Sequence, residues 1–111
     1  MENKKLLNKI EALLNQEGMK FKTIDGVEKK YYGTTTAYFD TLISVGPDKV
    51  NFGIFTTKNK IYSEDWLESE ANEFPLDKKF NAFLEHMKLL TDMFSMLQTK
   101  LDDINKQLEN L

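Results

Sequence analysis

The spacing of apolar residues divides the chain into a short helix, a run of strands and a second, much longer helix. In residues 3–16, apolar side chains recur at steps of three and four, with lysines and acids between them, which predicts an amphipathic helix. Glycine readily adopts the left-handed conformation at a helix C-terminus, so Gly18 is expected to end this helix. The apolar positions are Leu6, Leu7, Ile10, Leu13 and Leu14.

After Gly18 the pattern changes to alternation, which is typical of strands with one buried face. Turns are predicted at Asp25-Gly26, at Gly33 to Thr36 and at Gly46-Pro47-Asp48. We therefore expect an antiparallel meander of about four strands, at residues 19–23, 27–32, 37–45 and 50–56. Residues 58–60 are a candidate for one more turn, before Ile61-Tyr62.

The remainder of the chain, from Ser63 onward, has helical start signals. Ser63 is expected to cap a short acidic helix that begins at Glu64 and ends at Pro75. Asp77 is expected to cap the last helix, residues 78–111, which contains no helix breaker. The predicted fold class is therefore α+β: one domain, residues 1–111, with an N-terminal helix, a meander sheet, a short acidic helix and a long C-terminal helix.

The last helix carries an unbroken heptad pattern. Apolar residues recur at alternating steps of three and four, with Phe80 at position a and Phe83 at position d. Between residues 82 and 97 the stripe is widened by Leu84, Leu89, Met93 and Met96, which favours burial against a sheet or several helices. The heptad residues are Phe80, Phe83, Met87, Leu90, Phe94, Leu97, Leu101, Ile104, Leu108 and Leu111.

The length of this helix implies a partner for its far end. Residues 78–111 would span about 50 Å as a helix, whereas a compact domain of this size is about 35 Å across. We favour self-association through the end of this helix that extends past the domain. The alternative is that this end pairs antiparallel with the N-terminal helix of the same chain. The flanking e and g positions hold almost no complementary charge, so they fix neither the relative orientation of the associated helices nor their number. The predicted oligomerisation residues are Phe94, Leu97, Leu101, Ile104, Leu108 and Leu111.

Composition narrows the classes of function. The chain has no cysteine, which excludes disulfides and thiolate chemistry. All fifteen basic residues are lysine, so no guanidinium is present for bidentate contacts to guanine or phosphate. With a net charge of −3 and a pI of about 5.2, binding to nucleic acid is not expected. No signal peptide or membrane segment is evident, and we expect a cytoplasmic protein.

Acidic residues cluster in one segment. Six acids and no base lie between Glu64 and Asp77, so this segment is predicted to steer a basic protein partner, with Trp66 as the anchor. In the alternative interpretation, Trp66 and Leu67 hold a short helix to the core and the acids are solvated. The predicted protein-binding residues are Tyr62, Glu64, Asp65, Trp66, Glu68, Glu70 and Glu73.

Aromatic residues near lysines suggest a second contact surface. Single-stranded bases stack on aromatic rings flanked by basic residues, but tyrosine and tryptophan also dominate protein contacts. The absence of arginine and the adjoining acidic segment favour a protein partner. The aromatics are Tyr31, Tyr32, Tyr38, Tyr62 and Trp66, and the lysines are Lys20, Lys22, Lys29 and Lys30.

Signals for catalysis are missing from the sequence. His86 is the only histidine and is expected at the edge of the core, with no second nitrogen or sulfur ligand for a metal. No glycine-rich phosphate loop is present, and no serine has a base placed beside it. We expect no catalytic residue, no metal and no cofactor, and thus not an enzyme.

These features predict a non-enzymatic regulator, adaptor or inhibitor that binds protein and forms homo-oligomers. The order of helix, antiparallel sheet and long helix resembles the layout of small secretion chaperones and of phage-encoded inhibitors, although no residue motif accompanies that resemblance. Residue usage is typical of an AT-rich genome, such as a low-GC bacterium or its phage. An anti-CRISPR-like inhibitor is one form of the hypothesis, since the acidic segment resembles phosphate in charge. The alternatives are an oligomeric assembly protein and a single-strand nucleic-acid binder.

Overall fold

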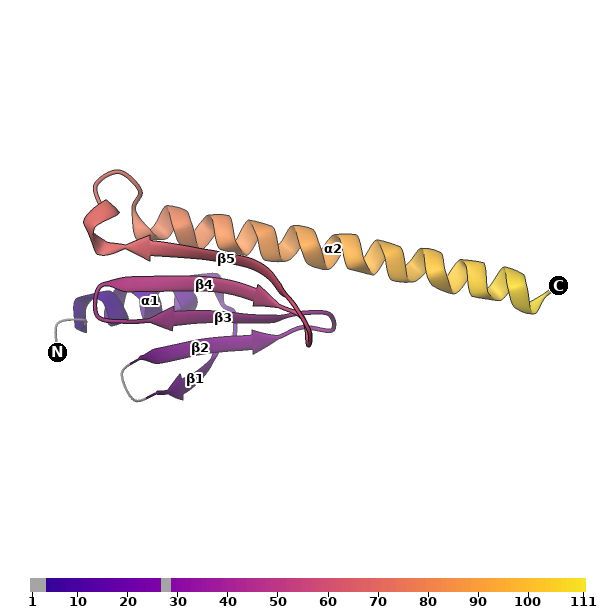
Figure 1. Ribbon diagram of the computed structural model, residues 1–111, viewed down its shortest axis with the longest axis horizontal. Helices are drawn as coiled ribbons and strands as arrows, with labels where there is room; N and C mark the ends of the chain where they lie inside the picture. Colours follow the sequence, from indigo (N-terminus) through magenta and orange to yellow (C-terminus); the bar gives the residue numbers. More distant parts are fainter. Residues whose placement is uncertain (1–3, 27–28) are drawn as a thin grey trace.

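The computed structural model describes residues 4–26 and 29–111 (Figure 1). It confirms the predicted α+β class, with an N-terminal helix, an antiparallel sheet and a long C-terminal helix. Residue 3 of the predicted first helix and residues 27–28 of the predicted second strand lie outside the described residues. The elements are α1 (Lys4–Glu17), β1 (Lys22–Asp25), β2 (Lys30–Thr35), β3 (Asp40–Val45), β4 (Lys49–Phe55), β5 (Lys60–Leu67), the 3₁₀ turn η1 (Glu68–Glu70) and α2 (Leu76–Glu109).

The sheet is a meander of five antiparallel strands in the order β1-β2-β3-β4-β5, one more than expected. The additional strand is β5, so the predicted acidic helix beginning at Ser63 and Glu64 is wrong. Within residues 63–75, the short 3₁₀ turn η1 is the only helical element. The strand forms because Tyr62, Glu64 and Trp66 alternate toward the helices, opposite Ile54, Phe52 and Val50 of β4.

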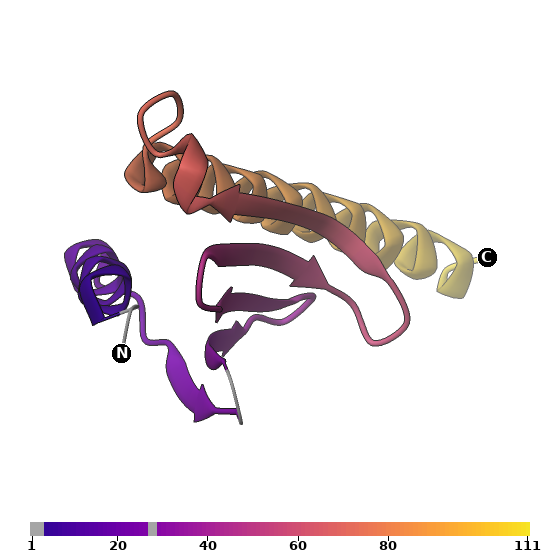
Figure 2. The ribbon, with the colours of Figure 1, turned by 60° about the vertical axis from the view of Figure 1, so that its left-hand side comes forward.

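Both helices cover the same face of the sheet and share one core with it (Figure 2). From α1, Leu6, Ile10 and Leu14 are buried, and Glu11 accepts a hydrogen bond of 3.2 Å from the Tyr32 hydroxyl of β2. Burial and the neighbouring Glu11 raise the pKa of Tyr32 to about 12, so the phenol stays protonated and keeps donating at neutral pH.

Aromatic rings hold α2 against β4. The Phe52 ring lies 5.4 Å from Phe83 and 6.4 Å from Phe80, measured between centroids. Tilted and edge-on pairs of buried rings at this separation add to the stabilisation that burial alone provides. The first turns of α2 are therefore fixed to β4, the strand next to the sheet edge formed by β5.

Both ends of α2 differ from the prediction, since the helix spans Leu76–Glu109 and not residues 78–111. Gly18 has a φ of +67° and ends α1 as expected. Asp77, however, is not the cap of α2: the helix begins at Leu76, Pro75 occupies the cap position, and Asp77 lies in the first turn. The Pro75 carbonyl accepts hydrogen bonds from the Lys78 and Lys79 amides at 3.1 and 3.3 Å, so proline sets the start of the helix.

The molecule is elongated because α2 runs past the end of the sheet (Figure 1). Its principal extents are 64 × 30 × 25 Å and its radius of gyration is 17.2 Å, compared with about 13 Å for a compact chain of this length. Within the described residues, none of the helices has the length and apolar character that crossing a membrane requires.

Candidate functional site

The heptad stripe of α2 is covered by the sheet only in its first half. Among the described residues of α2, none after Met87 is buried. Leu90 is half-buried, and every later residue of the stripe is exposed. The six residues predicted for oligomerisation are all at the surface of the chain: Phe94 is 39% exposed, Leu97 52%, Leu101 53%, Ile104 51%, Leu108 60% and Leu111 99%.

Phe94 marks the place where the sheet ends beneath α2. Its ring lies 4.9 Å from that of Phe39 and 6.0 Å from that of Tyr38, both in the turn between β2 and β3. Residues 97–109 extend about 20 Å beyond this contact at 1.5 Å per residue, away from the sheet (Figure 1). We call residues 94–111 the overhang.

The overhang is not covered by the N-terminal helix. The buried residues of α1, Leu6, Ile10 and Leu14, face the sheet, and α1 lies at the opposite end of the molecule from the C-terminus (Figure 1). The alternative of intrachain pairing along the stripe is therefore wrong, and pairing with another helix stays a prediction.

A second apolar row runs beside the stripe, and the prediction that all of its residues are buried against the sheet or other helices is wrong. Leu84 is buried as the widened pattern predicted, but Leu89, Met93 and Met96 are 60%, 50% and 62% exposed. With Leu97, the two methionines line a shallow apolar hollow of about 180 Å³ that Lys100 borders. The widening of the stripe pointed to these residues, but not to the fact that this chain leaves them uncovered.

Three amide residues and one lysine border the overhang. The flanking positions nearest the stripe are held by Gln98, Lys100, Asn105 and Gln107. Gln98 donates a hydrogen bond of 3.2 Å to Asp102 one turn later, which keeps its amide along the helix. The surface thus offers an apolar stripe with amides and one ammonium at its margins, a composition suited to packing against another apolar helix.

The predicted acidic surface does not form around Trp66. This side chain is 3% exposed, and its indole Nε1 donates a hydrogen bond of 2.8 Å to the Phe74 carbonyl. Trp66 therefore fixes the loop before α2 to the core, as the alternative interpretation expected of it, but that interpretation is wrong about the short helix and about Leu67, which ends β5 and is 40% exposed. Tyr62 and Glu64 point to the same side, where Glu64 accepts hydrogen bonds from Tyr62 and from Lys79 of α2.

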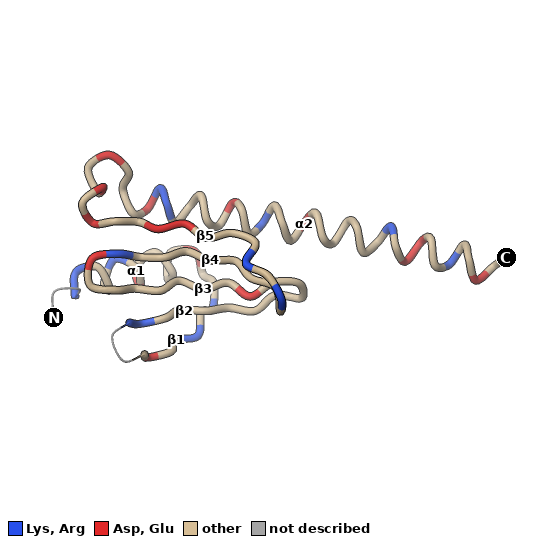
Figure 3. The backbone as a smooth tube through the Cα atoms, viewed as in Figure 1, with Lys and Arg blue, Asp and Glu red and all other residues tan. Residues whose placement is uncertain are grey.

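The other acids lie elsewhere. Asp65 is on the open face of the sheet, bonded to the Asn51 amide at 2.7 Å and paired with Lys49 at 3.6 Å. The hydrogen bond from Asn51 holds the pKa of Asp65 below its usual range. Acidic residues continue through the segment from β5 to α2 (Figure 3), where Glu68 and Glu73 are exposed and Glu70 is half-buried. Two apolar residues are each 40% exposed there: Leu67, which the alternative interpretation placed against the core, and Phe74, which was not predicted as a contact residue.

The structure does not bring the tyrosines and lysines together on one sheet face. Tyr32 is buried on the helix side, whereas its neighbour Tyr31 belongs to the open face. Tyr38 packs on Phe94, and Tyr62 stacks on His86 with ring centroids 4.5 Å apart. A row of exposed rings beside lysines, which stacking of successive bases requires, is thus not formed by these residues.

His86 lies at the edge of the core, as its g position beside the stripe predicted. Its Nδ1 is 2.8 Å from the Ala82 carbonyl, where a protonated Nδ1 donates, and its ring covers Tyr62. In the described part of the chain, no three histidine, cysteine, aspartate or glutamate side chains are grouped in a way that would hold a metal ion.

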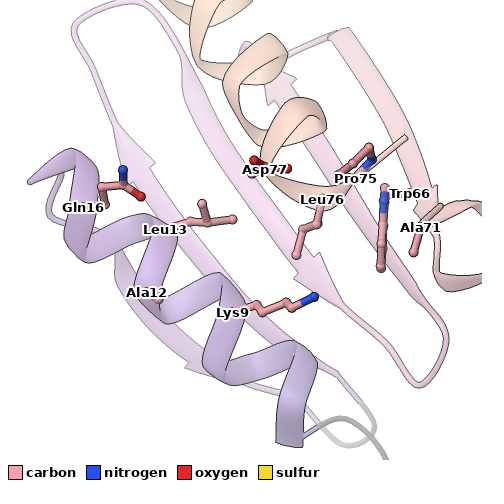
Figure 4. A pocket seen from close by; sticks show the side chains of 9 residues that line it. All are labelled: Lys9, Ala12, Leu13, Gln16, Trp66, Ala71, Pro75, Leu76 and Asp77. Atoms are coloured by element: carbon pink, nitrogen blue, oxygen red, sulfur yellow. The ribbon is translucent and has the colours of Figure 1, made fainter. Parts of the chain in front are cut away.

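A pocket of about 290 Å³ opens between α1 and the start of α2 (Figure 4). Leu13, Trp66 and Leu76 form its apolar walls, and Lys9 and Asp77 contribute the charged groups of the lining. The pocket lies between α1 and α2, which share one core. Its lining contains no serine, threonine or histidine.

No protein-family model, curated protein or solved structure matches this chain. The function must therefore be inferred from the chain's own residues. Among its surfaces, the overhang of α2 is distinguished by a continuous stripe of exposed apolar side chains.

Proposed function

We propose that this protein acts by binding protein, first a further copy of itself through the overhang of α2, and not by catalysis. The observation that carries the proposal is the exposed apolar stripe from Phe94 to Leu111, which continues the buried stripe of the same helix. An isolated monomer would keep this stripe in water. Burying a leucine-sized side chain stabilises by about 1.5–3 kcal/mol, so association of several such residues is favourable.

The stripe also has the form that helix pairing needs. Only the a and d positions are apolar after Leu97, while the outer positions hold residues such as Asp102, Asp103 and Lys106. A seam of this width fits one or two helical partners better than a sheet. We therefore assign the protein to the non-enzymatic regulators, adaptors and inhibitors that bind protein.

Sedimentation equilibrium tests the proposal. We expect a mass above 13.0 kDa at micromolar concentration, and L101D with L108D should weaken association at least ~100-fold, because two charges enter an apolar seam. S95D with T99D adds the same charge on the outer side of the helix and should leave the mass unchanged. A wild-type protein that is monomeric throughout the concentration range contradicts the proposal.

A second candidate function is recognition of a basic partner by the segment from β5 to α2. The observation in its favour is that Leu67 and Phe74, each 40% exposed, lie among Glu68, Glu70 and Glu73. Apolar contacts surrounded by carboxylates combine a desolvated anchor with long-range steering. An inhibitor of a basic nucleic-acid enzyme is one protein of this kind.

The experiment for this candidate compares two forms of the protein as bait in extracts of its native host. E68Q with E70Q and E73Q should fold normally, since these acids lie at the surface or at its edge. It should lose basic partners that the wild-type protein retains at low salt. If both baits retain the same proteins in equal amounts, the acidic segment is not the contact site.

A further inference from the structure

We propose that the partner of the overhang is a second copy of this chain whose α2 runs antiparallel to the first. The inference rests on the proposed function and adds orientation and register to it. The flanking charges leave orientation open, but the position of the sheet decides it.

The sheet occupies the side of α2 on which the partner must lie. Phe80, Phe83 and Met87 face the sheet, and the heptad pattern places the exposed stripe on that same side of the helix. Packed helices approach to 8–10 Å between axes. A partner helix on the stripe therefore lies in line with the sheet, beyond the turn where Tyr38 and Phe39 meet Phe94.

A parallel pair places two sheets in the same space. In that orientation the two α2 helices start at the same end, and each carries its own sheet on the side that faces the other helix, because Phe80, Phe83 and Met87 of the same stripe pack on that sheet. Helices kept 8–10 Å apart by the seam leave no room for two sheets between them. In the antiparallel pair, the two sheets lie at opposite ends and only the overhangs meet.

The antiparallel register is fixed by the end of the sheet. When the end of one helix reaches Phe94 of the other, three kinds of apolar layer form: Phe94 with Leu111, Leu97 with Leu108, and Leu101 with Ile104 of the second copy. The two-fold axis repeats each layer, as an isologous contact requires. A shift of one heptad inward brings the partner against residues that the sheet already covers, and a shift outward leaves Phe94 and Leu97 in water.

Charge and area both agree with this register. At the margins, Gln98 meets Asn105 and Lys100 meets Gln107 of the second copy, so no like charges face each other. The exposed parts of the six stripe residues amount to roughly 600 Å² per chain, and a dimer that buries both stripes reaches on the order of 1,200 Å², the lower end of specific interfaces.

Distance measurement between spin labels tests the orientation, and the chain offers clean sites because it contains no cysteine. E85C and K106C each place one label on the exposed outer side of α2. In the antiparallel dimer, Glu85 is separated from its copy by about 50 Å along the helix axis and Lys106 by about 10 Å. In a parallel dimer both pairs lie side by side.

The outcomes separate the orientation from the proposed function. A short Lys106 distance with a Glu85 distance of about 50 Å supports the antiparallel dimer. Short distances at both sites overturn the orientation and leave self-association standing. A sedimentation mass of three or four chains overturns the two-chain pairing alone. The absence of a Lys106 distance, together with a mass of 13.0 kDa, contradicts both proposals.

Discussion

Glu64 joins the last strand to the long helix through one carboxylate. It accepts hydrogen bonds from Tyr62 in its own strand and from Lys79 of α2, whose ammonium also lies 4.8 Å from the centroid of the Phe74 ring. The Lys79 side chain is only 10% exposed, so without Glu64 it would be a nearly buried, unpaired charge. The hydrogen bond from Lys79, and then that from Tyr62, lowers the pKa of Glu64.

This lowered pKa makes stability depend on pH in a defined direction. Because Glu64 binds its proton less readily in the folded chain than in the unfolded one, its contribution is complete above the unfolded value of 4.5 and is lost as the pH falls through the folded value. We expect E64Q to be about 1–2 kcal/mol less stable at neutral pH, less than for a fully buried pair because Glu64 is 39% exposed.

Urea unfolding followed by circular dichroism, between about pH 7 and pH 3, measures this difference. The gap between wild type and E64Q should close toward acid pH, where the wild-type carboxyl is itself protonated. E85Q, on the exposed outer side of α2, is the matched control and should follow the wild-type curve. A gap that stays constant over the whole range argues against the Glu64–Lys79 pair as its cause.

At the scale of elements, α1, the first four strands and α2 could be predicted because each signal was local, but the turn predicted at Gly33 to Thr36 was wrong: Gly33 to Thr35 belong to β2, and the chain turns at residues 36–39. The apolar steps of three and four, the alternation and the turn residues all lie within the segment that they describe. Gly18 is the clearest case, since its positive φ is a property of glycine itself. The sequence therefore supplied the α+β class and most of the element order.

The fifth strand was missed because its support is not local. Ser63, Glu64 and Asp65 have the pattern of a helix start, but Glu64 is neutralised by Lys79, fifteen positions away and in another element. Asp65 likewise bonds to Asn51 in β4. Trp66 was selected as a surface anchor for the same reason, since its burial depends on the Phe74 carbonyl, which it meets only in the folded chain.

The heptad of α2 was visible in sequence, but the point where its environment changes was not. The same spacing continues from Phe83, which is fully buried, to Leu101, which is 53% exposed. Only the position of the turn between β2 and β3 shows where the sheet stops covering the helix. This division of one helix into two environments gives a direct prediction for a shortened chain.

Removing residues 98–111 should leave the fold and its intrinsic stability unchanged within about 0.5 kcal/mol, because the removed side chains are exposed. The wild-type urea midpoint should rise with protein concentration, as expected when association stabilises the folded state, and the shortened chain should lose that dependence. F83A, in the covered part of the same stripe, should instead cost about 3–5 kcal/mol at every concentration. A shortened chain that fails to fold would show that the overhang supports the core.

At the scale of the whole molecule, charge argues against general binding to nucleic acid. The net charge is −3, and the candidate lysines for contact with nucleic acid lie on both faces of the sheet. Lys30 pairs with Glu11 at 3.5 Å on the helix side, whereas Lys22 belongs to the open face. We expect dissociation constants above about 10 µM for random single- or double-stranded DNA at physiological salt. Fluorescence anisotropy measures this, and submicromolar binding would return the lysine–aromatic hypothesis to first place.

The shape of the assembly provides the last prediction. One chain is 64 Å long, and in the antiparallel dimer two chains overlap only along their overhangs, so the longest dimension should reach about 100 Å, with a sheet at each end. Small-angle X-ray scattering should therefore give a two-lobed pair-distance distribution at the mass of two chains. The L101D and L108D variant should return to a single lobe with a radius of gyration near 17.2 Å. A wild-type dimer no longer than its monomer would place both sheets at the same end of the seam and would rule out the antiparallel arrangement.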